Sequence, residues 1–423
     1  MERSQLTIVN DGKSEVDTFS VCARTEDMNA TAIVQVGELG DDEKKNEYMT
    51  YTGELEGTPD GITCYNYGLL QPLKHKESRK LVVLQITTNH LQAYPKERKQ
   101  SEAPKVLVTI PETLVSSYKV EEEEASLMLT TSQTAVKKTG TREFEQQKQK
   151  LQFATKKNTP PFSADIFQVQ VGMNQAILRA RSVERDIHVS HWGSVRIKEV
   201  YDIANLSPSI KGEFSRLATM MNPDTGMQGA AHTLKAKVPA AAFDIRYRDE
   251  IGNISTSRMA TSGSWIALAL DPRFPVFGGW SAHFIFEYSV GLDAMVEKKG
   301  TGQYSVSFPS LPAIVDLTYD HVETRLHLPG GAQVNSNVQL GFPGSFSVSK
   351  EYTYLSMMPS PVLTITQDNA VTDMATVAVF NYGYQDILMF EKIAVACISL
   401  IAAVAFSVVV SSIDLGSGKS KTV

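Results

Sequence analysis

The sequence predicts a mainly β protein with two antiparallel β-sandwich-like domains and one C-terminal transmembrane helix. Short segments with alternating or β-branched residues recur along the chain, whereas helical periodicity is nearly absent before residue 392. Residues 393–410 contain no charged side chain, which is typical of a membrane span. With 423 residues, the chain is long enough for two packed domains and an appendage.

The expected strands are separated by Gly, Pro and polar turn residues. They are Lys80–Thr88, Lys105–Ile110, Ile166–Val171 and Arg325–Leu328. Phe243–Tyr247 also alternates, and the turn residues Asp249–Asn253 and polar Ser255–Ser257 follow it. This order predicts a hairpin with a longer loop.

The domain boundary is expected where the composition becomes polar. Residues 137–161 are rich in Lys, Gln and Thr and end in Thr159-Pro160-Pro161, which predicts an exposed loop near the end of the first domain. We therefore expect a first domain at 1–175, a second at 176–388, a transmembrane helix at 392–413 and a short tail at 414–423.

Charge and cysteine content limit the classes of partner and linkage. The 41 Lys and Arg against 47 Asp and Glu give a net charge of −6, and the basic residues form no stripe, so no nucleic-acid partner is expected. Of three cysteines, Cys397 lies in the apolar run, which leaves Cys22 and Cys64 as a candidate disulfide. The alternative is two buried free thiols.

The apolar run extends from residue 393 to about 413 and would span roughly 30 Å as a helix. Small residues recur in it every four positions and therefore lie on one stripe of the helix: Ser399, Ala403, Ser407 and Ser411. Such a stripe is a candidate face for packing against a partner helix. The alternative is that small residues are simply common in this span.

The topology has two readings. Residues 1–20 contain acidic and polar residues throughout and lack the apolar core of a signal peptide, which by itself predicts a tail-anchored protein with its bulk in the cytosol. One lysine, Lys392, precedes the span, and two lysines, Lys419 and Lys421, follow it. This excess of positive charge after the span favours a cytosolic C-terminus instead. Lys419 and Lys421 also resemble a dilysine retrieval signal of endoplasmic reticulum membrane proteins.

The sequence contains none of the motifs that usually announce chemistry. HExxH, GxGxxG, Walker, GxSxG and Asp-x-Asp patterns are all missing from it. We therefore expect no catalytic residue, no cofactor and no metal site.

Three Asn-x-Ser/Thr sequons begin at Asn29, Asn205 and Asn253, and they matter only if the region is lumenal. Pro208 follows the second and should weaken it as an acceptor. Asn253 follows the expected turn and should be exposed.

Five further segments, in this order and spacing, resemble the ribophorin I family. They are Val189–Gly193 (VSHWG), Lys211–Arg216 (KGEFSR), Pro239–Ala242 (PAAA), Tyr247–Ser257 (YRDEIGNISTS) and Pro272–Trp280 (PRFPVFGGW). Weaker similarity covers Tyr94-Pro95 and Leu328–Ala332. Gly278-Gly279 with the two prolines reads as a tight turn whose Phe274, Phe277 and Trp280 fill a core. The alternative is an aromatic surface that contacts other subunits or the acceptor polypeptide.

The resemblance implies a single-pass type I protein of the endoplasmic reticulum membrane with its bulk in the lumen. It implies a non-catalytic subunit of the oligosaccharyltransferase complex, which transfers a preassembled oligosaccharide from dolichyl diphosphate to Asn of Asn-x-Ser/Thr. Its implied partners are the catalytic and small membrane subunits and nascent polypeptides, and its implied role is assembly and acceptor presentation. Family catalysis belongs to a subunit with a Trp-Trp-Asp motif, whereas Trp192, Trp265 and Trp280 are never adjacent here.

Two rival functions make different predictions. A self-sufficient glycosyltransferase would transfer oligosaccharide without a partner. A tail-anchored cytosolic scaffold would have no role in glycosylation and would carry no N-glycans.

Overall fold

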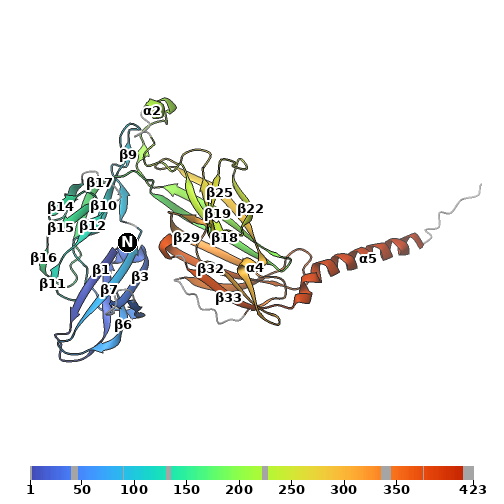
Figure 1. Ribbon diagram of the computed structural model, residues 1–423, viewed down its shortest axis with the longest axis horizontal. Helices are drawn as coiled ribbons and strands as arrows, with labels where there is room; N and C mark the ends of the chain where they lie inside the picture. Colours follow the sequence, from blue (N-terminus) through green and yellow to red (C-terminus); the bar gives the residue numbers. More distant parts are fainter. Residues whose placement is uncertain are drawn as a thin grey trace, which may run out of the picture.

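The computed structural model describes residues 2–39, 46–88, 90–129, 135–221, 227–334, 344–374 and 376–412. Strands dominate it, and the helix α5 (Glu391–Ser412) projects from the C-terminal group of strands (Figure 1). The prediction of a mainly β fold with a C-terminal apolar helix is thereby confirmed.

Residues 2–87 form two sheets that share one core. One sheet has the order β1-β7-β3-β4 and the other β2-β6-β5. Their strands are β1 (Glu2–Val9), β2 (Val16–Arg24), β3 (Thr31–Leu39), β4 (Asn46–Tyr48), β5 (Thr50–Glu54), β6 (Ile62–Leu73) and β7 (Ser78–Thr87), with α1 (Thr25–Asn29) between β2 and β3. Buried Phe19, Tyr67, Val36 and Leu81 come from both sheets, so the sheets pack face to face.

Residues 91–173 have a separate core. The strands are β8 (Leu91–Ala93), β10 (Lys105–Pro111), β11 (Val120–Glu123), β12 (Ser126–Met128), β13 (Val136–Thr139), β14 (Phe144–Gln147), β15 (Lys150–Phe153), β16 (Lys156–Thr159) and β17 (Ile166–Gly172). They form the sheets β13-β17-β10-β8, β12-β15-β14 and β11-β16. The stretch expected as a single first domain thus contains two main clusters of buried side chains.

The prediction of an exposed loop at residues 137–161 is wrong, because this segment forms most of β13 and all of β14, β15 and β16. Leu151 and Phe153 lie two apart on β15 and are buried, and the Phe153 ring meets the Phe167 ring edge-on at 5.0 Å. Arg142 is buried as well and pairs with Glu123 at 2.9 Å. These few buried residues are enough to order a segment that is polar on average.

Residues 178–384 contain the largest core. The central sheet has the order β22-β25-β19-β18-β29-β32-β31, and two sheets with the orders β23-β24-β21-β28 and β26-β27-β33-β30 accompany it. The central strands are β18 (Leu178–Ser190), β19 (Ser194–Asn205), β22 (Phe243–Asp249), β25 (Ser281–Gly291), β29 (Thr318–His327), β31 (Ser345–Glu351) and β32 (Ser360–Val371). The others are β21 (Leu234–Pro239), β23 (Arg258–Ser262), β24 (Trp265–Leu270), β26 (Val296–Gly300), β27 (Gln303–Pro309), β28 (Ile314–Val315), β30 (Gln333–Val334) and β33 (Val377–Gly383), with α4 (Leu292–Met295) and the 3-10 turn η1 (Thr372–Met374) between strands. Alternate residues of β19 enter this core, as a half-buried strand requires.

The central sheet departs from the expected antiparallel pairing at its middle, where β18 and β29 run parallel. More than a hundred residues separate the two strands in the sequence. A long connection lets the chain re-enter the sheet in the same direction, which a tight turn cannot do.

The hairpin expected after residue 247 is also corrected. The chain does reverse, since Asp249 N donates to Gly252 O and Ile254 N donates to Tyr247 O. Only one isolated bridge, Arg248 with Asn253, follows, and β22 pairs instead with β25. The second arm therefore forms no strand of its own.

A buried ion pair lies inside the largest core. Arg185 of β18 and Glu199 of β19 are fully buried, with 3.1 Å between Arg185 Nε and a Glu199 carboxylate oxygen. Arg185 also donates to Pro309 O at 2.6 Å, and Glu199 accepts from Tyr201 OH at 2.6 Å and Ala313 N at 3.0 Å. Burial raises the pKa of Glu199, while the Arg185 charge and these hydrogen bonds act in the opposite direction.

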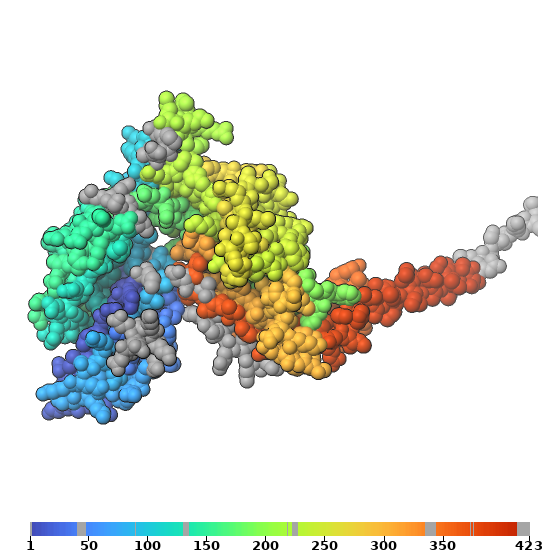
Figure 2. All heavy atoms as spheres, in the orientation of Figure 1, coloured from blue at the N-terminus to red at the C-terminus, as the bar shows by residue number. Residues whose placement is uncertain are grey.

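The strands of residues 2–173 (the N-terminal group) and those of residues 178–384 (the C-terminal group) contact each other. The short strands β9 (Glu97–Arg98) and β20 (Ser209–Ile210) pair in parallel, close to α2 (Arg216–Met221). Arg98 Nη2 also donates to Gln228 O at 2.7 Å. Figure 2 shows the two groups meeting at this end and α5 leaving from the other side.

Candidate interaction surface and membrane anchor

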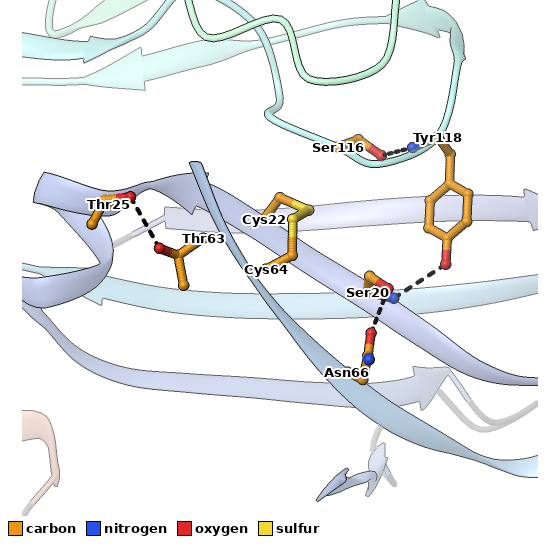
Figure 3. Close-up of a disulfide and its surroundings, with 8 residues drawn as sticks. All are labelled: Ser20, Cys22, Thr25, Thr63, Cys64, Asn66, Ser116 and Tyr118. Carbon is orange, nitrogen blue, oxygen red and sulfur yellow. Dashed lines mark hydrogen bonds between the residues drawn. A yellow bond between two sulfur atoms is a disulfide. The ribbon is translucent and has the colours of Figure 1, made fainter. Parts of the chain in front are cut away.

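Cys22 and Cys64 form a disulfide between paired positions of β2 and β6 (Figure 3). Both cysteines are buried, and buried Ile62 and Val115 pack in the same small cluster. The disulfide joins the two strands at a sequence separation of 42 residues. Nearby, Tyr118 OH accepts from Ser20 N, which ties the segment between β10 and β11 to this sheet (Figure 3).

Two of the five motif segments meet in an aromatic cluster. The Phe277 ring lies 4.9 Å from the Phe214 ring and 5.2 Å from the Trp280 ring, and Phe274 lies 6.0 Å from Trp280. Phe277 is fully buried, whereas Phe274 and Trp280 are exposed. The prediction of a core position is therefore correct for Phe277 and wrong for Phe274 and Trp280, which lie at the surface.

A third motif segment is tied to this cluster by an ion pair. Arg273 Nε and Nη2 donate to the two carboxylate oxygens of Asp249 at 2.7 and 2.9 Å. Asp249 also accepts from the backbone of Ile251 and Gly252 in its own turn. The Arg273 hydrogen bonds, followed by these backbone donors, lower the pKa of Asp249 to about 2. The carboxylate thus fastens the turn before Asn253 to the Pro272–Trp280 segment.

Gly278 is required by a close backbone approach. A Cβ at this position would lie 2.2 Å from Pro208 O and 2.4 Å from Ser207 O. Both carbonyls belong to the backbone that connects β19 and β20, so the lack of a side chain at Gly278 lets the two segments touch.

Gly278→Ala should lower the free energy of unfolding of this part by about 1–3 kcal/mol, because one segment must shift. Urea titration followed by tryptophan fluorescence measures this, since Trp280 lies two residues away. Gly300→Ala is the matched control, because its Cβ would meet nothing within 4 Å. Equal urea midpoints for the two variants would contradict the steric argument.

The three sequons lie in different environments. Asn29 and Asn253 are exposed, whereas Asn205 is 1% exposed. The Asn205 amide donates to Gly229 O at 2.7 Å and to Val276 O at 2.8 Å, and its Oδ1 accepts from Ser207 N at 3.0 Å. Both N–H groups and the carbonyl oxygen of this side chain are therefore hydrogen-bonded inside the fold.

We expect glycopeptide mass spectrometry of the protein from its native membrane to find glycans at Asn29 and Asn253 and none at Asn205. A glycan on Asn205 would replace one N–H of a buried amide whose two N–H groups both donate inside the core. A glycan on Asn205, or a bare Asn253, would contradict this prediction.

The helix α5 is apolar enough, and at about 33 Å for its 22 residues long enough, to cross a bilayer. The 3-10 turn η2 (Asp386–Phe390) precedes it and is held by the β structure. Asp386 accepts from Tyr304 OH and pairs with Lys298 Nζ at 3.0 Å. Trp192 Nε1 donates to Met389 O at 3.1 Å. The base of the helix is thus fixed to the C-terminal group of strands.

The predicted packing stripe lies on the surface of α5, where Ser399, Ala403, Ser407 and Ser411 are all exposed. The hydroxyls of Ser399 and Ser411 donate hydrogen bonds to carbonyls of their own helix, Ala396 O and Val408 O. Lys419 and Lys421 of the predicted retrieval signal lie outside the described residues.

Three histidines of the C-terminal group of strands have ordinary partners. His188 of β18 stacks on His327 of β29 at 4.1 Å, and burial followed by the His327 charge lowers the pKa of His188 to about 4. His191 bonds Tyr382 OH at 2.9 Å. Within the described ranges, no group of three or more His, Cys, Asp or Glu side chains could hold a metal ion.

Comparison with protein families decides what these motifs have in common. The family model described as ribophorin I matches residues 1–411. The chain belongs to the ribophorin I family. The match runs through both groups of strands and nearly to the end of α5.

Curated relatives carry a consistent name. The chain is 30% identical over 87% of its length to dolichyl-diphosphooligosaccharide–protein glycosyltransferase subunit 1A of Arabidopsis thaliana, and it spans 60% of that protein. It is 26% identical over 92% of its length to subunit 1B of the same plant, spanning 84% of that protein. Subunit 1 of Caenorhabditis elegans is 26% identical over 72% of this chain, which covers 52% of the relative.

Sequence reasoning missed two features of this ribophorin I fold. Arg185 and Glu199 face each other at paired positions of β18 and β19, and neither strand nor a buried charge was predicted there from the sequence. The attachment of Trp192 to the base of α5 was also missed. Its signal was available, since Trp192 belongs to the motif Val189–Gly193.

Proposed function

We propose that this chain is a non-catalytic subunit of an oligosaccharyltransferase complex that N-glycosylates nascent polypeptides in the endoplasmic reticulum. The observation that carries the proposal is the family match over residues 1–411, with relatives named as subunit 1 of this transferase. In this role the chain helps to assemble the complex and to present acceptor polypeptides, while another subunit performs the transfer.

We propose a type I orientation, with both groups of strands in the lumen and the residues after α5 in the cytosol. The Cys22–Cys64 disulfide supports this orientation, because such bonds persist in oxidising compartments and are rare in the cytosol. The exposed sequons at Asn29 and Asn253 suit a lumenal surface. We also propose that the first lumenal domain ends at about residue 175. Lys419 and Lys421 are proposed as a signal that retrieves the protein to the endoplasmic reticulum.

Depletion of the protein tests the function. We expect underglycosylation of many secreted proteins and loss of assembled complex, measured by site-occupancy mass spectrometry and native gels. Normal glycosylation together with normal assembly would contradict the proposal. Endoglycosidase treatment separates it from a tail-anchored cytosolic scaffold, because only a lumenal chain shifts in mobility.

The stripe on α5 is proposed as the docking face for a partner helix, because small residues let two helix backbones approach closely in lipid. Ala403→Leu with Ser407→Leu should reduce co-purification of the catalytic subunit in mild detergent. Ile401→Leu with Val408→Leu, which lie off the stripe, should not. Equal co-purification of the two double variants would show that the stripe does not hold the complex.

A further inference from the structure

Large exposed apolar and aromatic side chains gather where α5 leaves the β structure. We call them the juxtamembrane patch, and they are Trp192, Tyr352, Tyr354, Met357, Ile387 and Phe390. They come from three separate segments: the turn after β18, the segment between β31 and β32, and η2. Figure 1 shows α5 leaving from this end of the C-terminal strands. Soluble surfaces seldom gather such residues without a partner.

The segment between β31 and β32 is fastened to the first residue of α5. One Glu391 carboxylate oxygen accepts the backbone N–H groups of both Met357 and Met358, the latter at 2.7 Å. Ser356 Oγ approaches the other oxygen at 3.5 Å. The side chain of Met357 is left exposed, so the hydrogen bonds fix the backbone and present the side chain outward.

The turn after β18 and η2 are fastened to the same point. Trp192 Nε1 donates to Met389 O, and the Trp192 ring meets the Phe390 ring edge-on at 5.8 Å. Leu388 packs against the largest core, close to Gly331, where a Cβ would lie 2.8 Å from Leu388 Cδ1. The segments that carry the patch are therefore attached to the start of α5 and to the β structure.

We propose that the juxtamembrane patch lies in the headgroup layer of the membrane and seats the C-terminal β structure directly on the lipid surface. This inference rests on the proposed membrane anchor. With α5 about 33 Å long against a hydrocarbon core of about 30 Å, Glu391 and Lys392 fall at the boundary between lipid and water. Any bilayer that contains α5 must bring that boundary to the residues fastened to Glu391.

The chemistry of the patch fits lipid headgroups better than a protein partner. Trp and Tyr have an apolar ring and a polar atom, and this combination concentrates them at membrane interfaces. Lys392 beside the patch can extend its ammonium to the phosphate layer. A seat of this kind would hold the lumenal strands at a fixed tilt to the membrane and would not leave them swinging on a single helix.

Site-specific labelling of the full chain in phosphatidylcholine nanodiscs tests this. In a Cys397→Ala background, the remaining cysteines are disulfide-bonded, so Tyr354→Cys carries an environment-sensitive NBD label alone. Met220→Cys on α2 is the control, because Met220 is 79% exposed against 87% for Tyr354 and α2 lies at the end of the molecule away from α5 (Figure 1). Met357→Cys gives a second label in the patch.

We expect a blue-shifted emission at 354 and 357, quenching by lipids spin-labelled near the headgroup, and iodide quenching several-fold weaker than at 220. Labels at 354 and 357 as open to iodide as the label at 220 would overturn the inference. So would protection that arises only when the other subunits are present, because the occupant would then be protein. Co-elution of the chain with the discs separately tests the anchor, and a chain that fails to enter discs overturns both proposals.

Discussion

Glu199→Ala should lower the free energy of unfolding of the C-terminal β structure by about 3–5 kcal/mol, because it leaves the Arg185 guanidinium buried without its counter-charge. Tyr201 OH and Ala313 N lose their acceptor in the same change. Urea titration followed by tryptophan fluorescence measures the effect, since all three tryptophans lie between residues 192 and 280.

Glu184→Ala is the matched control for this prediction. Glu184 precedes Arg185 on the same strand, is exposed, and pairs with Arg325 at 3.0 Å, so its loss should cost about 0–1 kcal/mol. Arg185→Met with Glu199→Leu should recover most of the stability, because no charge is then left buried. Equal urea midpoints for Glu199→Ala and Glu184→Ala would show that the pair contributes no more than a surface ion pair.

Removal of the disulfide by Cys22→Ser with Cys64→Ser should destabilise residues 2–87 by about 4 kcal/mol. The sequence separation of 42 residues sets this magnitude, because an open chain of that length gains considerable entropy when it unfolds. Hydrogen exchange of the β2 and β6 amides measures the loss, and it avoids the tryptophans, which all lie elsewhere.

The state of the same cysteines in cells is a companion measurement. Maleimide labelling of denatured, unreduced protein should modify one thiol per chain, Cys397, and three after reduction. Cys397→Ser is the control, and it should leave the exchange of β2 and β6 unchanged. Three reactive thiols without reduction would contradict both the linkage and a lumenal location.

The sequence predicted the strands whose alternation is strong and the helix whose apolar run is long. Lys105–Ile110 lies within β10 and Ile166–Val171 within β17. These strands could be predicted because successive side chains of a strand point to opposite faces of the sheet, which produces a regular alternation in the sequence. The prediction for residues 137–161 was wrong because the polar average composition, with many Lys and Gln, concealed the buried Leu151 and Phe153. Local composition cannot weigh two side chains that pack against a distant strand.

The remaining features depend on pairing over long sequence distances. No local pattern specifies that β29 lies parallel to β18, or that Arg273 reaches back to Asp249. The motif segments could be recognised one by one, but their meeting around Phe277 could not be derived from spacing. Trp192 likewise acquires its role only when the fold brings the base of α5 beside it.

Affinity capture of the tagged full chain from mildly solubilised endoplasmic reticulum membranes tests the central claim most directly. The captured material is assayed for transfer of oligosaccharide from dolichyl diphosphate to an Asn-x-Thr peptide. Membership of the transferase as an accessory subunit predicts that transfer activity is captured with the chain and is absent once the chain is stripped of its partners. Captured chain without transfer activity, or transfer by the stripped chain alone, would contradict it.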